Sequence, residues 1–398
     1  MLKAGHPAMT VLLGAVIAIA PLAMDVYLAS MPSMARALST TPDKVQLTLS
    51  VYMFAWGAVQ LVAGPMSDRF GRRPLLLGGL AIFVAASAAC ALSRTIEMLI
   101  ASRFVQAVGM ATVVVVPRAV VRDLHSGNLA ARMLSAMGMV LGIAPIVAPV
   151  LGSHLHVWFG WQSNFVFVAL YGALAWMCVA AGLPETLARR DATALDPTMM
   201  LRNFATLLRS RRYIGYLLVA GFTSSGLFAF LAGSAYVFVS GLGTGERGFG
   251  VLFSMVMLGN ITGATIASRV VVRLGLDRLI AYGTWLMLAA GLSMAALAWA
   301  RIEHPAALVV PMFLFMGAFM ATMPQATAGA LTPFPRIAGS AASLMSFFQF
   351  VLAATVAQIV GVAFDGTARP MASAIAIAAA LSFLSFRTLV TRRASAPA

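Results

Sequence analysis

Twelve long apolar segments, separated by short stretches rich in Gly, Pro and charged residues, constrain this chain more than any other feature of its sequence. A helix needs about 20 apolar residues to cross roughly 30 Å of hydrocarbon, and each segment is near that length. The pattern predicts an all-α polytopic membrane protein, because helices satisfy their own backbone hydrogen bonds in lipid. The predicted spans are 9–32, 45–66, 74–93, 96–117, 133–153, 162–183, 213–239, 249–268, 279–300, 305–331, 340–364 and 370–386.

The composition excludes several other classes of protein. Hydrophobic residues make up 61% of the chain and charged residues 10%, whereas soluble domains average about 45–50% and about 25%. No GxxxxGK[ST] motif is present, which excludes nucleotide hydrolysis by a P-loop. Cys90 and Cys178 lie inside apolar segments and are interpreted as small hydrophobic residues. We expect neither an enzyme nor a metal site, because no catalytic or ligand cluster shares a plausible depth in the membrane.

The distribution of basic residues predicts the orientation. The net charge is +15, and Lys and Arg favour cytoplasmic loops. With the N-terminus inside, most basic residues fall in the cytoplasmic connections; the opposite side holds only Arg36, Lys44, Arg94, Arg247, Arg301 and Arg369. We therefore predict that both termini are cytoplasmic, that the protein is multi-pass in a bacterial inner membrane, and that its basic excess reflects topology and not nucleic-acid binding.

The longest polar stretch divides the chain into two halves. We predict an N-terminal six-helix bundle over 1–183, a cytoplasmic linker over 184–212 and a C-terminal six-helix bundle over 213–398. Within the linker, Asp196 can cap a helix that begins at Pro197. Its alternating apolar and Arg residues suit a helix on the lipid surface, although a flexible basic linker is an open alternative.

A short internal repeat supports duplication of the two halves. Arg69-Phe70-Gly71 follows the second predicted span, and Arg273-Leu274-Gly275 follows the eighth. Two six-helix repeats are an architecture of many secondary transporters.

Asp25 is the one acidic residue well inside a predicted span. It lies roughly 10 Å from the outer end of the first span, at 1.5 Å per residue. A charge at that depth is expensive unless it is protonated, paired or hydrated, so we interpret Asp25 as a proton carrier. Pro21, four residues earlier, predicts a bend beside it. The alternative is a permanent ion pair that only fixes helix packing.

Arg103 is the one cation well inside a span, at a depth similar to that of Asp25. Isolated opposite charges in one apolar medium are expected to pair or to share a wet cavity. Arg keeps its proton whereas Asp can lose it, so only Asp25 can respond to a proton gradient. The alternative is that Arg103 extends its side chain outward to the interface.

The loop after the second span carries an acid and three arginines. Its residues are Gly64, Asp68, Arg69, Gly71, Arg72 and Arg73, and Pro74 begins the next helix. This loop resembles the G-x-x-x-D-R-x-G-R-R signature of the major facilitator superfamily, at the position where that family has it. The resemblance implies the major facilitator fold and a cytoplasmic gate at this loop.

Three further motifs resemble those of the Bcr/CflA-type drug/proton antiporters in that superfamily. Asp25-Val26-Tyr27-Leu28-Ala29-Ser30-Met31-Pro32 is similar to D-x-Y-L-P-x-x-P, with Ala29 in place of a proline. Arg103 and Gln106, followed by Gly109, are similar to the proton-linked R-x-x-Q-G-x-G element. The fifth span resembles the antiporter helix rich in Gly and Pro, through Gly138, Gly142, Pro145, Pro149 and Gly152.

The substrate site is less visible in the sequence. Polar side chains inside spans favour an interior or wet face, and 25 methionines offer adaptable apolar surface. Each polar residue could instead form an interhelical hydrogen bond. The candidates for the cavity are Tyr27, Tyr52, Gln60, Gln106, Asn260, Gln325, Gln349 and Gln358.

These observations and the resemblance together predict a proton-coupled secondary transporter that exports small amphiphilic drugs, similar to chloramphenicol or bicyclomycin, by alternating access. We expect a monomer in lipid whose partners are the substrate and protons, with the proton gradient as its energy source and no cofactor. One alternative is a major facilitator exporter or importer of a metabolite such as a sugar or amino acid. Another is a passive channel or a membrane scaffold.

Overall fold

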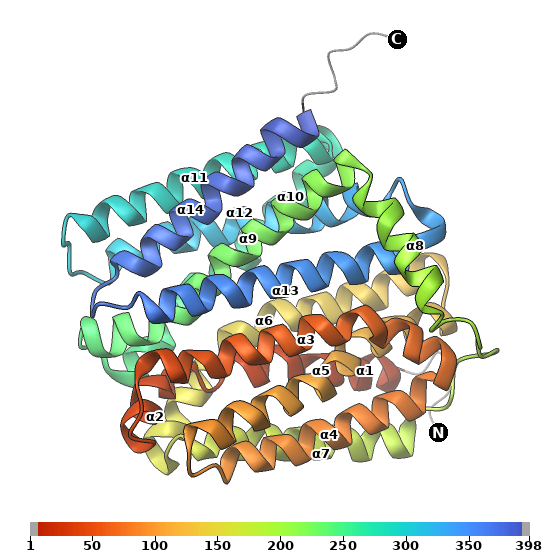
Figure 1. The fold of residues 1–398 in the computed structure, drawn as a ribbon, viewed down its shortest axis with the longest axis horizontal. Helices are drawn as coiled ribbons and strands as arrows, with labels where there is room; N and C mark the ends of the chain where they lie inside the picture. The colour runs from red at the N-terminus through yellow and green to blue at the C-terminus, as the bar shows by residue number, and fades with distance from the viewer. Residues whose placement is uncertain (1–6, 392–398) are drawn as a thin grey trace. The chain divides into compact units, whose positions relative to one another are not determined.

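A computed structural model describes residues 7–391, and this part of the chain is all-α, as the apolar segments predicted. Figure 1 shows the helices, most of them long. Their bounds are α1 Pro7–Asp25, α2 Met31–Ala37, α3 Pro42–Phe70, α4 Arg72–Ala91, α5 Ile96–Leu124, α6 Gly127–Phe159, α7 Gln162–Gly182, α8 Pro197–Leu208, α9 Arg211–Ala235, α10 Gly245–Leu274, α11 Leu276–Trp299, α12 Ala306–Leu331, α13 Ala338–Val362 and α14 Arg369–Ser385.

The described residues contain 12 segments that are long and apolar enough to cross a membrane, which confirms the predicted number of spans. The first span is interrupted just after Asp25, close to the predicted bend, although α1 runs through Pro21. The α-helix α1 ends at Asp25, a 3-10 turn covers Leu28–Ser30, and α2 continues the span. Pro32 accounts for part of this break, since it lacks an N–H and its ring crowds the carbonyl of Leu28.

The chain divides into two compact units, Met1–Asp196 and Pro197–Ala398. In the first unit, α5 packs against α3 and α4, α4 packs against α7, and α1 packs against α6. In the second unit, α9 packs against α13 and α14, and α12 packs against α10 and α11. Each unit therefore has its own helical core, and the division falls inside the predicted linker.

The helix predicted to begin at Pro197 is present as α8, so this part of the predicted linker is helical. Leu207 is fully buried in a cluster with Tyr213 and Tyr216, and Asn203 Nδ2 donates a hydrogen bond to Ser340 Oγ at 3.3 Å. Leu201 on α8 remains exposed. The helix is thus fixed to the second unit along one side and carries apolar surface on another.

The two loops of the predicted repeat share one backbone feature. Gly71 after α3 has a φ of 107°, and Gly275 after α10 has a φ of 77°. Glycine adopts such positive values without the steric penalty of a side chain. Each glycine N–H also closes its preceding helix, by donating to Ser67 O at 3.1 Å and to Val271 O at 2.8 Å.

Candidate functional site

Asp25 lies in the first unit, where the first span breaks. It is the last residue of α1 and is only 5% exposed. Helix α6 crosses the break so closely that a Cβ on Gly152 would overlap the carbonyl group of Val26. The sequence therefore places a carboxyl group at a helix end that a neighbouring helix presses against.

Arg103 is fully buried on α5, so it does not extend outward to the interface. Its Nη1 donates hydrogen bonds to Ala23 O at 3.1 Å and to Gln106 Oε1 at 2.5 Å. Gln106 Nε2 in turn donates to Ser87 Oγ at 2.7 Å, which ties α5 to α4. These neutral acceptors supply part of the polar surroundings that a buried guanidinium needs.

Aromatic rings supply the rest of the surroundings of Arg103. Its guanidinium carbon lies 4.0 Å from the ring centre of Tyr52 and 4.5 Å from that of Tyr27. Phe165 on α7 is a third, more distant ring at 5.8 Å. A desolvated cation over an aromatic face gains about 2 kcal/mol or more, so these rings make the buried charge tolerable.

Of the two arrangements expected for Asp25 and Arg103, a direct pair or a shared wet cavity, the direct pair is not observed. Within residues 7–391 no hydrogen bond or ion pair joins the two side chains; Arg103 contacts the backbone of Ala23 instead. The physical reason is the break in the span, because the last carbonyls of a helix have no intrahelical partner and carry partial negative charge. Arg103 thus has an acceptor at the end of α1 that does not involve the carboxyl group of Asp25.

The structure brings three of the predicted cavity residues together, since Tyr27, Tyr52 and Gln106 all contact Arg103. Gln60 is buried on α3. The other candidates lie in the second unit, where Asn260 on α10 donates to Met257 Sδ at 3.5 Å. Half-buried positions on α12 and α13 hold the remaining candidates, Gln325, Gln349 and Gln358.

The sequence interpretation missed two residues that complete this site. Phe165 contacts both Tyr27 and Arg103 but is one of 24 phenylalanines, with nothing in its local pattern to mark it. Asn164 beside it donates to Ser30 Oγ at 2.6 Å. An amide inside an apolar segment was the available signal for Asn164.

The loop between α3 and α4 is held by a network centred on the buried side chain of Arg72. Its Nη1 donates to Asp68 Oδ1 at 2.5 Å and to Ser67 Oγ at 2.7 Å. Its Nε donates to Asp123 Oδ2, at the end of α5, at 2.8 Å. One arginine therefore joins the ends of three helices through charge-assisted bonds.

Glu185, which follows α7, closes the same network from a fourth segment. Its two oxygens accept the backbone N–H groups of Arg72 at 3.0 Å and Arg73 at 3.3 Å. A carboxylate at the N-terminus of α4 also complements the helix dipole. Arg73 contacts Ala180 O at 2.8 Å. Arg69 lies over the Phe70 ring, and Gly64 has no atom within 4 Å of an added Cβ.

The fifth span is the continuous helix α6, with Pro145 and Pro149 inside it. Of the three glycines that carry the resemblance on this helix, only Gly152 makes a close helix contact, at the backbone of Val26. A Cβ added to Gly138 or Gly142 would meet no atom within 4 Å. These two glycines therefore leave space along α6 instead of marking a tight crossing.

Comparison with known proteins decides the family. The model of the major facilitator superfamily matches residues 13–358, most of the chain. The chain belongs to the major facilitator superfamily. It is therefore a multi-pass membrane protein with the family and fold of transporters rather than enzymes.

The relatives support the narrower resemblance to Bcr/CflA-type proteins. A bicyclomycin resistance protein homolog of Haemophilus influenzae is 30% identical over 96% of this chain and 95% of its own length. A chloramphenicol resistance protein of Pseudomonas aeruginosa is 29% identical over 86% of this chain and 81% of its own. Multidrug resistance protein D of Escherichia coli is 29% identical over 86% of each chain.

Solved structures confirm the fold. The xylose transporter XylE of E. coli, in a partially occluded inward-open conformation, gives a TM-score of 0.75 at 13% identity, with 98% of this chain and 99% of that chain covered. A POT family transporter in complex with 5-aminolevulinic acid gives a TM-score of 0.78 at 13% identity, covering 96% and 95%. Identities this low establish the shared architecture alone.

Proposed function

We propose that this member of the superfamily exports small amphiphilic compounds, such as chloramphenicol- or bicyclomycin-like antibiotics, in exchange for protons. The names of its relatives support the substrate class. The observation that carries proton coupling is Asp25, a buried carboxyl group at a break in the first span with no bond to the neighbouring cation. In this proposal the protein works as a monomer in a bacterial inner membrane, with both termini in the cytoplasm.

Arg103 is the fixed charge of the proposed mechanism, because a guanidinium keeps its proton in proteins. Its bond to Ala23 O depends on the end of α1 staying where it is. A change at the break that moved this carbonyl would release the guanidinium toward Asp25 and favour the ionised carboxylate. Proton release would then be coupled to a movement of α1.

Alternating access supplies the rest of the cycle. Asp25 loses its proton toward the cytoplasm, a drug enters, and protonation from the outer side accompanies its release. A potential of 100 mV contributes about 2.3 kcal/mol per charge moved, so one proton per cycle supports a sizeable drug gradient. The Arg72 network would act as the cytoplasmic gate, because breaking it frees the ends of α3, α4 and α5.

The test is drug-driven proton movement in everted membrane vesicles that contain the full-length protein. Asp25→Asn should abolish it with expression unchanged, because the amide cannot exchange a proton, and Asp25→Glu should retain part of it. Asp43→Asn is the matched control, since Asp43 lies in the first turn of α3 outside the break. Full exchange by Asp25→Asn would refute the proton-carrier role.

The substrate class needs a separate measurement. A susceptibility panel of chemically diverse drugs, in a host that lacks its own pumps, should show protection against chloramphenicol- or bicyclomycin-like compounds. Loss of that protection in the Asp25→Asn variant would connect resistance to the proton carrier. Protection against none of the panel, with intact vesicle transport of a sugar or amino acid, would refute drug export.

A further inference from the structure

A cavity at one end of the second unit is lined by charged side chains that the transport mechanism does not use. Its volume is about 320 Å³, within the range of ligand pockets. It lies where α11 ends, where α12 begins and where the α13–α14 connection enters α14. The charged residues of its lining are Arg301, Glu303 and Arg369.

In the described part of the chain, these three charged side chains do not form ion pairs with one another. Within residues 7–391 no ion pair joins Glu303 to either arginine. The Arg369 guanidinium lies over the Trp299 ring, 5.0 Å from its centre, and the Arg369 Nε is buried without a hydrogen-bond partner. Among the described residues, Asp365 interacts with Arg369 through charge alone, without an ion pair, because its Oδ1 accepts the hydroxyl and N–H of Thr367 at 2.6 and 2.9 Å.

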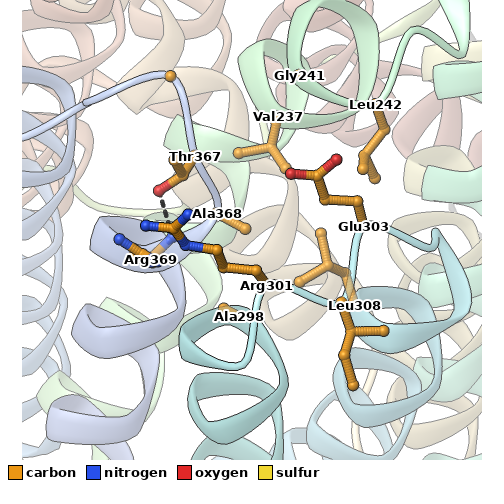
Figure 2. Close-up of a pocket in the computed structure, with 12 residues that line it drawn as sticks. Val237, Gly241, Leu242, Ala298, Arg301, Glu303, Leu308, Thr367, Ala368 and Arg369 are labelled. Atoms are coloured by element: carbon orange, nitrogen blue, oxygen red, sulfur yellow. Dashed lines mark hydrogen bonds between the residues drawn. The ribbon is translucent and has the colours of Figure 1, made fainter.

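The backbone holds the positive side of this cavity in place. Arg301 adopts a φ of 58°, a left-handed conformation that is uncommon for a residue with a side chain. Helix α14 begins at Arg369, so its positive N-terminal end also opens here. Figure 2 shows the two arginines on one side of the view and the Glu303 carboxylate on the other, pointing toward Val237.

An apolar groove adjoins the charged cavity, and Ile302 lines both. The groove has a volume of about 530 Å³ and runs between α11 and α12, past Leu297, Val310 and Leu314. From the start of α12 to Leu314 it extends about 12 Å along the helix, at 1.5 Å per residue. Val310 and Leu314 are exposed in the structure, as lipid-facing side chains of a span are.

We propose that the cavity and groove together bind a phospholipid with a zwitterionic phosphate–ammonium headgroup, of the phosphatidylethanolamine type. Arg301 and Arg369 bind the phosphate, since guanidinium groups match phosphate oxygens. Glu303 binds the ammonium, and the groove takes the start of an acyl chain. A simple anion fits less well because it would leave Glu303 unpaired beside a like charge. By the predicted orientation, this lipid belongs to the outer leaflet.

Native mass spectrometry of the detergent-solubilised full-length protein tests the proposal. The wild type should retain phosphatidylethanolamine at least about tenfold more tightly than phosphatidylglycerol. Arg301→Gln and Arg369→Gln should each weaken that binding about tenfold, the loss of about one charge-assisted contact. Glu303→Gln should remove the preference between the two lipids. Arg94→Gln is the control, because Arg94 is an exposed arginine of the other unit and should have no effect.

A competition experiment separates a lipid from a free zwitterion. Soluble glycerophosphoethanolamine should compete at least about a hundredfold more weakly than the lipid, because it cannot fill the groove. Val310→Trp should block the groove and weaken lipid binding while leaving binding of the soluble headgroup unchanged. Equal binding of the soluble headgroup and the lipid would overturn the lipid assignment. No preference for phosphatidylethanolamine, or an equal effect of Arg94→Gln, would overturn the site itself.

Discussion

The two units of this transporter differ in what they bury. Every charged side chain that is buried among the described residues belongs to the first unit, namely Asp25, Arg72 and Arg103. The second unit fills its interior with neutral groups, such as the Thr223 and Ser382 hydroxyls, which are hydrogen-bonded at 2.9 Å. Burying a charged group costs free energy. The three buried charges of the first unit are therefore better explained by a function than by helix packing alone.

The loops of the internal repeat show the same contrast. Gly71 and Gly275 make the same kind of positive-φ turn. Arg72 in the first loop is buried against two carboxylates, whereas Arg212, which approaches Asp277 in the second loop at 3.6 Å, is largely exposed. The repeat has therefore kept the turn but not the charge network. This difference supports placing the proposed proton coupling and the proposed gate in the first unit.

Removing the buried cation should give the largest difference between the units. Arg103→Leu should lower proton-coupled transport at least about 100-fold, because it deletes two bonds of a charged group, each about 1.5–3 kcal/mol, and removes the buried cation that bonds the end of α1. Ser382→Ala in the second unit should cost only about 1 kcal/mol of stability. Vesicle transport and thermal unfolding measure the two effects.

Arg103→Lys sharpens this test. Lysine keeps the charge but loses the planar group that stacks on Tyr27 and Tyr52 and bonds Gln106. We expect partial transport with a reduced unfolding temperature. Uncoupler-sensitive transport at the wild-type level in Arg103→Leu would show that the buried charge is structural, and the contrast between the units would lose its functional meaning.

Removing the arginine from each loop's ion pair should give the next largest difference between the units, in the free energy of unfolding. Arg72→Gln should lower the free energy of unfolding by about 2 kcal/mol, less than for a fully buried pair because Asp68 is half exposed and water replaces part of its contact. Arg212→Gln should change it by no more than about 0.5 kcal/mol, since that pair is exposed. Thermal unfolding in detergent compares them; equal losses would mean that the two loops are equivalent after all.

The sequence predicted the parts of this molecule that depend on local pattern. Apolar length located the 12 spans, and a cap followed by proline located the start of α8. Asp25 and Arg103 stood out because charge is rare in such segments. These signals need no knowledge of which helices touch.

The missed features all depend on tertiary contacts. Arg103 binds Ala23 O because α1 stops at Asp25, and a backbone carbonyl has no signature in a sequence. Glu185 reaches the start of α4 from a segment 113 positions away from Arg72. Gly138 and Gly142 follow the same pattern of small residues as Gly152, yet only Gly152 meets a neighbouring backbone. Spacing on one helix does not reveal what lies opposite.

Each unit has a glycine at which two helices cross closely. Substituting these glycines can distinguish an effect on stability from an effect on proton coupling. Gly152→Ala would push a Cβ into Val26 O at the break, and Gly263→Ala would push one into the backbone of Gly317. Each should cost about 1–3 kcal/mol of stability, measured by thermal unfolding. Only Gly152→Ala should also impair proton coupling, because only that crossing adjoins Asp25.

Gly142→Ala is the control for both crossings. Its added Cβ would meet no atom within 4 Å, and alanine favours a helix over glycine by about 1 kcal/mol. Stability should therefore rise slightly with transport unchanged. If Gly263→Ala abolished proton coupling as fully as Gly152→Ala, the break at Asp25 would have no special role.

The smallest expected effect concerns a loop feature that the two units share. Asp191 and Asp365 each accept hydrogen bonds from the hydroxyl and N–H of a threonine two positions later, Thr193 and Thr367. These bonds, led by the threonine hydroxyl, hold the pKa of each carboxyl below its usual 3.8. Because the pKa is lower in the folded state, the stabilisation is complete above about pH 4 and is lost as the pH falls through the folded-state pKa.

Replacing either threonine tests whether these two loops behave alike. Thr193→Val should raise the pKa of Asp191 toward 3.8, and Thr367→Val should do the same for Asp365. Serine at either position should leave the pKa low, because serine keeps the hydroxyl. A ¹³C NMR titration of labelled aspartate carboxyls measures these pKa values. Similar shifts in both units would show that the halves still share local loop chemistry where no buried charge is involved. A shift in one unit alone would extend the divergence of the two units to their exposed loops.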